Sequence, residues 1–297
     1  MSQTVKIGTR GSDLALWQAN FVKSELEKQG TKVELVIIKT QGDQIQHLSL
    51  DKLEGKGFFT KEIEAALLEN EVDIAVHSHK DLETEQPFGL TIAAVSARAA
   101  ASELLLIHPN AVDNTKKFSF KENAVIGTSS SRRKSQVLHH RPDITLKDIR
   151  GNVPTRVNKL RQGEFDAILL AKAGVDRLGL DLSDLVAIEL PTTDFVPAPA
   201  QGVLALQCRS NDKKVIELLS HLHHTDVQRV VHIERTVLNK MKGGCHLPLG
   251  VYAEEKNHEF TVRVSYAKQW NSPVRYITFK SDHFDRLPDQ IVDSLMN

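Results

Sequence analysis

Short apolar segments alternate with helix-forming segments along the first two thirds of this chain, and no other feature constrains its fold as strongly. Apolar runs at 5–9, 32–40, 73–78 and 90–96 are separated by polar or amphipathic stretches. A second series begins near residue 101, with the apolar segments ELLLIH, AVIGTSS, ITLKDIR, DAILLAKAG and LVAIELP. Strands that alternate with helices are typical of α/β domains with mainly parallel sheets. We therefore predict two α/β lobes.

The helices between these strands have recognisable ends. In SDLALWQANFVKSELEKQG, Ser12 or Asp13 is the expected N-cap and Gly30 the stop, and Leu14, Trp17 and Phe21 share one face. TKEIEAALLENE is expected to form a further helix, and two more fall at roughly 130–141 and 153–162.

The pattern changes after about residue 222. We expect one long amphipathic helix from TDVQRVVHIERTVLNKM and antiparallel strands from FTVRVSYAK and VRYITFK. A closing helix is expected from DRLPDQIVDSLMN. These elements predict a small α+β domain. The proline-rich segment 190–202 is an expected crossing between domains, after which VLALQC (203–208) could rejoin the first sheet.

Bulk properties narrow the class of protein. At 297 residues the chain is too long for one ordinary core. Lys+Arg and Asp+Glu both number 38, and this balance disfavours nucleic acid as a partner. The N-terminus lacks a signal-peptide pattern, and no apolar run approaches the roughly 20 residues of a membrane span. We therefore expect a cytoplasmic protein that does not bind membranes.

Cationic and hydroxyl side chains cluster where predicted strands give way to helices. In AVIGTSSSRRKSQ a Thr/Ser run opens a helix, whose free N–H groups attract anions. Solvated surface arginines beside a capped helix are the alternative. Similar junctions recur in both lobes, and ligands of open α/β sheets bind at the carboxyl ends of strands. The pattern predicts a cleft between two domains for a polycarboxylate or phosphate, with these cations: Arg10, Lys80, Arg132, Arg133, Arg150, Arg156 and Arg177.

Asp81 is the one carboxylate among these cations. In a partly desolvated site it could serve in proton transfer, and the alternative is a structural partner for Lys80. The histidine pairs His77/His79 and His221/His224 lack a third ligand at convincing spacing, so no metal site is predicted.

Cys245 lies in the loop KMKGGCHLPLG, where two glycines leave room for another group to approach the thiol. Structural cysteines are usually surrounded by apolar residues instead. The loop therefore indicates a thiol presented to a ligand.

Eight segments in sequence order, from residue 7 to about 252, resemble the porphobilinogen deaminase family, also called hydroxymethylbilane synthase. They are TRGSDLALWQA, GKGFFTKEIEAALL, DIAVHSHKDL, IGTSSSRRKSQ, IRGNVPTRVNKL, FDAILLAKAGVDRLGL, AQGVLALQCR and GGCHLPLG. The C-terminal 45 residues carry little recognisable motif.

The resemblance implies a reaction and a cofactor. Such enzymes join four porphobilinogen molecules head to tail, with loss of ammonia at each step, to give the linear tetrapyrrole hydroxymethylbilane. The product passes to uroporphyrinogen-III synthase. The chain grows on a dipyrromethane cofactor that is attached by a thioether to the loop cysteine, here Cys245. A monomer is expected.

The resemblance also assigns roles to residues. Asp81 matches the family's catalytic aspartate, and Lys56, Gly57 and Phe58 match a mobile loop over the cleft. Up to twelve ligand carboxylates would require the basic residues named above, and arginine binds carboxylates bidentately. Further hydrogen bonds to cofactor or substrate are expected from Ser12, Thr128, Ser130, Asn152 and Gln201.

The family fold implied is two lobes similar to periplasmic binding proteins and a small C-terminal α+β domain. The expected boundaries are 1–97 plus 197–217 for domain 1, 98–196 for domain 2, and 218–297 for domain 3. Departures from the family pattern include Ala99 to Ala101, Pro154, Ala200, His79, Gln41 and His246.

Two rival interpretations remain at this point. A non-catalytic two-lobe binding protein for a polycarboxylate or phosphate would need neither Cys245 nor Asp81. A diverged relative could keep the fold without turnover.

Overall fold

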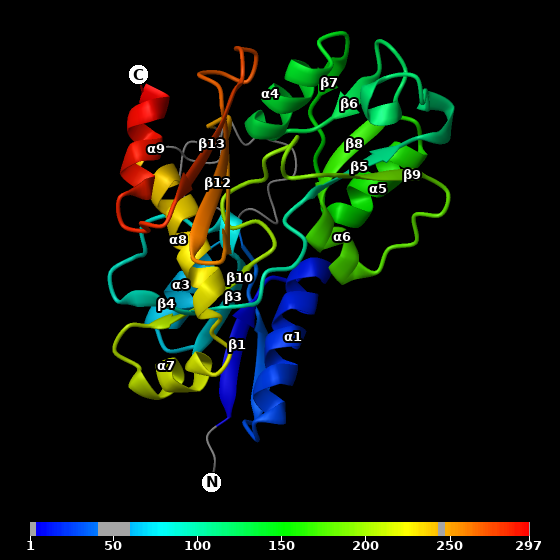
Figure 1. Cartoon of the computed structure of the whole chain (residues 1–297). Helices are drawn as coiled ribbons and strands as arrows, with labels where there is room; N and C mark the ends of the chain where they lie inside the picture. Colours follow the sequence, from blue (N-terminus) through cyan, green and yellow to red (C-terminus); the bar gives the residue numbers. More distant parts are fainter. Residues whose placement is uncertain (1–3, 41–59, 243–246, 297) are drawn as a thin grey trace. The chain divides into compact units, whose positions relative to one another are not determined.

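The computed structural model describes residues 4–40, 60–242 and 247–296 (Figure 1). The chain divides into two compact units. Residues 1–99 and 202–229 form unit 1, and residues 100–201 and 230–297 form unit 2.

Unit 1 is an α/β unit whose strands match the predicted apolar runs. Among its described residues, five strands form one sheet in the order β2-β1-β3-β10-β4. β1 pairs in parallel with β2 and β3, whereas β10 runs antiparallel to β3 and β4. The elements are β1 (Val5–Thr9), α1 (Asp13–Lys28), β2 (Val33–Ile37), α3 (Lys61–Leu68), β3 (Ile74–Ser78), β4 (Leu90–Val95), β10 (Leu204–Arg209) and α7 (Lys213–Ser220).

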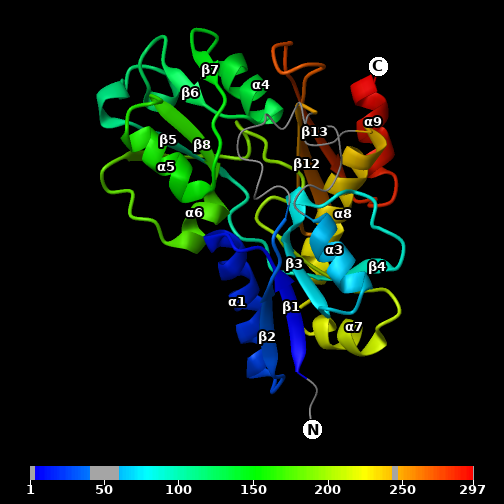
Figure 2. The ribbon, with the colours of Figure 1, turned by 180° about the vertical axis from the view of Figure 1, so that it is seen from behind.

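Both faces of this sheet are covered by helices. α1 and α7 pack on one face, where Val22 and Leu219 join a core with Ile7. α3 packs on the opposite face through Ile63 and Leu67. Figure 2 shows this helix from behind, beside the strands of the sheet. The prediction that the segment at 203–208 rejoins the first sheet is confirmed by β10.

Unit 2 contains a second sheet of the same design. In the part of the chain that the structure describes, its strand order is β7-β6-β8-β5-β9. β6 is parallel to β7 and β8, and β5 is antiparallel to β8 and β9. The elements are β5 (Glu103–Ile107), β6 (Val125–Gly127), α4 (Ser131–His140), β7 (Thr145–Lys147), α5 (Val153–Arg161), β8 (Ala167–Ala171), α6 (Lys172–Leu178) and β9 (Val186–Leu190).

Helices again cover both faces of this second sheet. Val137 of α4 packs with Phe120 and Phe195 on one face. Leu160 of α5 and Val175 of α6 pack on the other. The chain therefore has the predicted α/β class, with one antiparallel strand in each sheet.

A small α+β layer completes unit 2. β11 (Leu249–Lys256), β12 (Glu259–Tyr266) and β13 (Arg275–Ser281) form an antiparallel sheet. α9 (Leu287–Met296) packs on one face of it, together with the part of α8 (Thr225–Lys240) that belongs to unit 2, from Val230 on (Figure 1). This agrees with the predicted C-terminal α+β domain. The three-domain boundaries given above stay a prediction.

Gly250 allows β11 to approach the crossing segment closely. The Val251 N–H donates to the Pro197 carbonyl over 3.1 Å. A Cβ at position 250 would lie 2.6 Å from both the Val196 carbonyl oxygen and the Ser265 Oγ. Moving the backbone carbonyl to relieve this clash would cost free energy. Only glycine therefore fits here.

We expect Gly250→Ala to destabilise the protein by about 3 kcal/mol, the upper range for an overpacked site. Thermal unfolding checks this, with a midpoint expected to fall by several degrees. Gly11→Ala is the matched control, because a Cβ there meets only the Ile37 Cγ2 at 3.4 Å, an ordinary contact distance. Equal midpoints for the two variants would contradict the packing argument.

Candidate active site

Four predicted site residues gather at one edge of the unit 1 sheet. Arg10 directly follows β1, and Lys80 and Asp81 lie in a 3₁₀ turn, His79–Asp81, that directly follows β3. Ser12 caps α1, with its side chain accepting from the Ala15 N–H. Because β1 and β3 are parallel neighbours, their carboxyl ends meet at the same edge.

The turn that carries Asp81 is held from behind by hydrogen bonds. The His79 N–H donates to the Val203 carbonyl over 2.9 Å, and Gln18 Nε2 donates to Ser78 Oγ over 2.8 Å. The Asp81 side chain itself is exposed. A carboxylate that is exposed on a held turn is accessible to a ligand, as a group that transfers a proton must be.

A buried polar chain lies beneath this edge. His77 Nε2 is 3.0 Å from Gln207 Oε1, and Gln207 Nε2 donates to Glu64 Oε1 and Gln86 Oε1. The Gln207 oxygen is therefore the acceptor, which makes His77 Nε2 the protonated nitrogen of a neutral ring. Burial lowers the pKa of His77 to about 4, the Gln207 hydrogen bond opposes this, and Arg10 lowers the pKa further.

His77 predicts a pH-dependent stability. In the unfolded chain the His77 ring becomes protonated as the pH falls below 6.5. In the folded chain the ring stays neutral until the pH falls to about 4. The stability that the neutral ring contributes is present above pH 6.5 and is lost as the pH falls towards 4.

The shift corresponds to about 3 kcal/mol. Denaturant unfolding of the wild type and of His77→Gln between pH 7 and pH 4 measures it. We expect the variant to lose less stability than the wild type across this window, and parallel curves would contradict the assignment.

The predicted anion-binding residues of unit 2 also lie at one sheet edge. β6, β7 and β8 are parallel and adjacent, so the segments that follow them meet at their carboxyl ends. Ser130 caps α4 and accepts from the Arg133 N–H over 3.4 Å, and Thr128 Oγ1 accepts from the Ser130 N–H. Asn152 caps α5 and accepts from the Thr155 N–H over 2.9 Å. Two helix N-termini therefore open at this edge.

Three cations accompany these termini. Arg150 precedes α5, and its Nη2 is buried without a hydrogen-bond partner among the described residues. Arg156 Nε donates to the Gly151 carbonyl over 2.8 Å. Arg177 lies on α6, and burial lowers the pKa of its guanidinium to about 10. Because burial disfavours the charged form of Arg177, an anionic ligand beside its guanidinium would stabilise that charge.

Arg132 and Arg133 are buried, so they are not the solvated surface arginines of the alternative interpretation. Their exposed fractions are 5% and 7%, and both form ion pairs with Glu103. The amide of Gln201 is also buried and donates to the Ala101 carbonyl over 2.7 Å and to Glu103 Oε1 over 3.1 Å. A direct contact of these three side chains with a ligand stays a prediction.

Glu103 is the residue that sequence reasoning missed. It begins an otherwise apolar segment, GluLeuLeuLeuIle, and its side chain is fully buried. The available signal was a carboxylate at the start of an apolar run in a chain with an Arg-Arg pair, because a buried carboxylate needs partners.

Other predicted site residues lie outside the described part of the chain. These are Cys245 and the loop residues Lys56, Gly57 and Phe58. Within residues 4–40, 60–242 and 247–296, no cluster of three or more His, Cys, Asp or Glu side chains could hold a metal ion. No helix in those ranges has the length and apolar character needed to cross a membrane.

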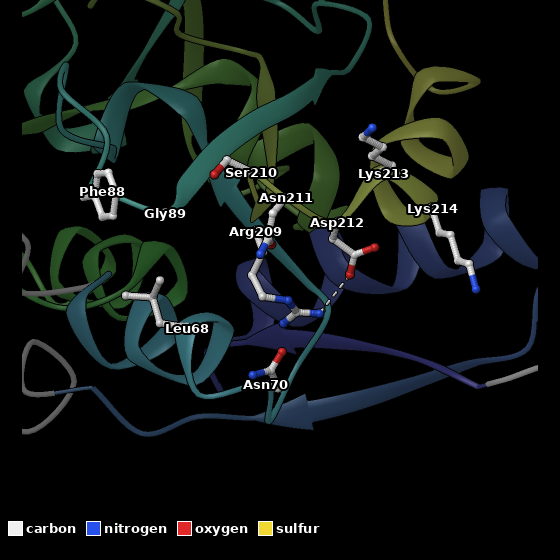
Figure 3. A pocket seen from close by; sticks show the side chains of 10 residues that line it. All are labelled: Leu68, Asn70, Phe88, Gly89, Arg209, Ser210, Asn211, Asp212, Lys213 and Lys214. Atoms are coloured by element: carbon white, nitrogen blue, oxygen red, sulfur yellow. Dashed lines mark hydrogen bonds and ion pairs between the residues drawn. The ribbon is translucent and has the colours of Figure 1, made fainter.

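A surface pocket of about 780 Å³ lies away from these residues (Figure 3). It is lined by the end of α3, the start of β4, the end of β10 and the start of α7, including Leu68, Phe88 and Arg209. Arg209 is paired there with Asp73 and Asp212. This pocket is at the opposite edge of the unit 1 sheet from Arg10 and Asp81, and none of the predicted site residues line it.

Comparison with known protein families decides the identity. Residues 5–217 match the model described as "Porphobilinogen deaminase, dipyromethane cofactor binding domain". The chain belongs to the porphobilinogen deaminase family. Residues 229–266 match the C-terminal domain of the same family.

Named relatives support the assignment over most of the chain. It is 45% identical to the porphobilinogen deaminase of Nitratiruptor sp. over 83% of this chain and 77% of that protein. It is 40% identical to that of Pelobacter propionicus over 99% of this chain and 94% of that protein. The resemblance found in the sequence is therefore confirmed.

Solved structures with a similar arrangement include periplasmic binding proteins. A periplasmic substrate-binding protein from Coxiella burnetii is 14% identical, with a TM-score of 0.45, over 75% of this chain and 94% of that one. An ancestral arginine-binding protein is 13% identical, with a TM-score of 0.41, over 75% and 91%. The fold assignment itself follows from the strand order of the two α/β sheets.

The family's dipyrromethane cofactor fits the residues of unit 2. Its pyrrole rings carry carboxylate groups. The edge where β6, β7 and β8 end offers two helix N-termini and the Arg150 Nη2, which has no hydrogen-bond partner within residues 4–40, 60–242 and 247–296. Arginine N–H groups and helix N-termini are the donors that carboxylates require. The described residues are therefore chemically suited to this cofactor.

Proposed function

We propose that this chain is a hydroxymethylbilane synthase, a transferase of porphyrin and heme biosynthesis. It condenses four porphobilinogen molecules head to tail, with loss of one ammonia at each step, and gives the linear tetrapyrrole hydroxymethylbilane. The match of residues 5–217 to the family model carries this conclusion. The position of Asp81 at the carboxyl ends of β1 and β3 supports it.

The basic residues bind the acetate and propionate groups of the pyrrole rings. Arg150 has a buried donor available for a carboxylate, and Arg156 lies at the N-terminus of α5. In unit 1, Arg10 and Lys80 flank Asp81 at their common edge. Charge-assisted hydrogen bonds of this kind orient a substrate as well as hold it.

Asp81 acts on the aminomethyl group of porphobilinogen. It assists protonation of the amine, the C–N bond breaks, and ammonia leaves. The carboxylate then stabilises the positive charge of the resulting methylene-pyrrole. A carbon–carbon bond forms to the free α-carbon of the growing chain, which releases a proton. An ionised Asp81 can accept this proton.

The dipyrromethane, when bound, supplies the free α-carbon that receives the first substrate unit. We propose Cys245 as its thioether attachment point. The loop of Lys56, Gly57 and Phe58 is proposed to cover the site. We propose that six arginines hold the carboxylates of the dipyrromethane together with those of the substrate. These are Arg10, Arg132, Arg133, Arg150, Arg156 and Arg177.

We further propose that the protein acts as a monomer in the cytoplasm and hands its product to uroporphyrinogen-III synthase. Family membership supports these assignments. Light scattering of the purified protein tests the monomeric state, since a particle of twice the chain mass would contradict it.

The function is tested by incubating the purified chain with porphobilinogen. We expect one ammonia released for each porphobilinogen consumed, with hydroxymethylbilane as the product. A two-lobe binding protein would bind porphobilinogen without releasing ammonia, and that outcome would overturn the proposal.

A further inference from the structure

A buried ion triad lies behind the first turn of α4. Glu103 accepts from Arg132 Nη2 over 2.5 Å, from Arg133 Nη2 over 2.7 Å and from Arg133 Nε over 3.1 Å. The exposed fraction of Glu103 is 0%, and the two arginines are nearly as buried. The three side chains together carry one net positive charge.

The strand topology places this triad at the ligand-binding edge. β5 runs antiparallel to β8, and Glu103 at its amino end pairs with Ala171 at the carboxyl end of β8. β8 is parallel to β6, which leads into Ser130 and the N-terminus of α4. Glu103 is therefore at the edge where β6 and β8 end, although it begins its own strand.

The triad fixes the orientation of both guanidinium groups. Arg133 uses Nε and Nη2 on a single Glu103 oxygen, and its Nη1 donates to the Leu169 carbonyl over 3.0 Å. Arg132 Nη1 donates to the Val196 carbonyl over 2.9 Å. Gln201 adds a fourth hydrogen bond to Glu103 over 3.1 Å. Neither arginine can turn without breaking contacts to two partners.

Stability alone does not account for such an arrangement. Buried ion pairs lose about as much in desolvation as they gain in attraction, and apolar replacements are often neutral or stabilising. Two buried arginines on one carboxylate also give the triad itself one net positive charge. The triad lies at the sheet edge where ligands bind, so we explain it by the effect of its positive charge on a ligand there.

We propose that Glu103 is a positioning residue for the reaction. It holds Arg132 and Arg133 in place behind the N-terminus of α4 and cancels one of their two charges. The single positive charge that remains then favours one carboxylate of a pyrrole ring at that terminus. This inference rests on the proposed function, because it assumes that the ligand is the pyrrole substrate or cofactor.

The test compares Glu103→Gln with Glu189→Gln. Both change a glutamate to its neutral isostere in the same sheet, but Glu189 is an exposed residue of β9 whose side chain accepts from Ser102 Oγ. We expect Glu103→Gln to raise the KM for porphobilinogen at least about tenfold, with kcat reduced less than about threefold, because ground-state binding is lost. Glu189→Gln should match the wild type.

Glu103→Asp separates charge from geometry. The carboxylate is retained but is one methylene too short to hold both arginines as Glu103 does. We expect a KM between those of the wild type and Glu103→Gln, and an unfolding midpoint below that of the wild type, because buried hydrogen bonds are weakened while the charge stays. If Glu103→Gln does not fold, Glu103→Asp carries the test by itself.

The outcomes distinguish this inference from the proposed function. Wild-type values of KM and kcat in a folded Glu103→Gln, or in Glu103→Asp when the glutamine variant does not fold, would mean that the triad is only structural. A wild-type protein that neither binds nor consumes porphobilinogen would overturn the proposed function and this inference with it.

Discussion

Replacing Asp81 by asparagine is expected to lower kcat for porphobilinogen by at least about 100-fold, the lower range for loss of a general acid or base. Asparagine has nearly the same shape but can neither transfer the proton nor balance the positive charge of the methylene-pyrrole. The side chain is exposed on its 3₁₀ turn, so the change should leave the fold intact. Steady-state release of ammonia measures the effect.

Glu85→Gln provides the matched control for Asp81→Asn. Glu85 is an exposed carboxylate four residues along the same segment and is outside the proposed site. Its loss should leave kcat within about twofold of the wild type, because isolated surface charges contribute little. Unfolding midpoints of both variants should equal that of the wild type. An Asp81→Asn protein that retains a third or more of wild-type kcat would contradict the assigned role.

The strands of this fold were predictable because each is a short apolar run with clear ends. The segments at 5–9 and 73–78 became β1 and β3, and the helix expected at 130–141 became α4 at Ser131–His140. Buried strands covered on both faces need apolar side chains throughout, and this pattern is local in sequence. Local patterns also narrowed the cap of α1 to Ser12 or Asp13, and the structure has Ser12.

Long-range pairing was less accessible. The antiparallel direction of β5 depends on partners at least 60 residues away in the chain, and no local pattern encodes it. β11 was missed because its first residues belong to the LPLG stretch of the cysteine loop segment. On α1, Trp17 and Phe21 do share a face and stack with centroids 5.6 Å apart, but they are exposed, and Ala19, Val22 and Leu26 form the buried side.

The same limit applied to the candidate site. Residues that follow parallel strands, such as Arg10, Asp81 and Arg150, were correctly placed at sheet edges, because the edge follows from strand direction alone. The ion pairs of Arg132 and Arg133 were not foreseen, because both arginines lie in α4 and their partner Glu103 lies in β5, about 30 residues earlier. A motif identifies which residues are present, whereas tertiary contacts decide how their charge is used.

Cys245→Ser is expected to abolish cofactor attachment, and with it all turnover of porphobilinogen. A serine hydroxyl is a much poorer nucleophile than a thiolate, so no thioether can form and no comparable ether is expected. The intact mass of the wild type should exceed that of the polypeptide by two porphobilinogen units less two ammonias. The variant should have the mass of the bare polypeptide, which mass spectrometry measures directly.

Cys208→Ala is the control that isolates the loop cysteine. Cys208 is fully buried in β10, and burial raises the pKa of its thiol to about 11, so it is not a reactive thiolate at neutral pH. Its replacement should leave the added mass unchanged. An adduct that persists in Cys245→Ser, or disappears in a folded Cys208→Ala, would show that Cys245 is not the attachment point. A wild-type protein with no added mass, even after incubation with porphobilinogen, would instead favour the non-catalytic binding protein.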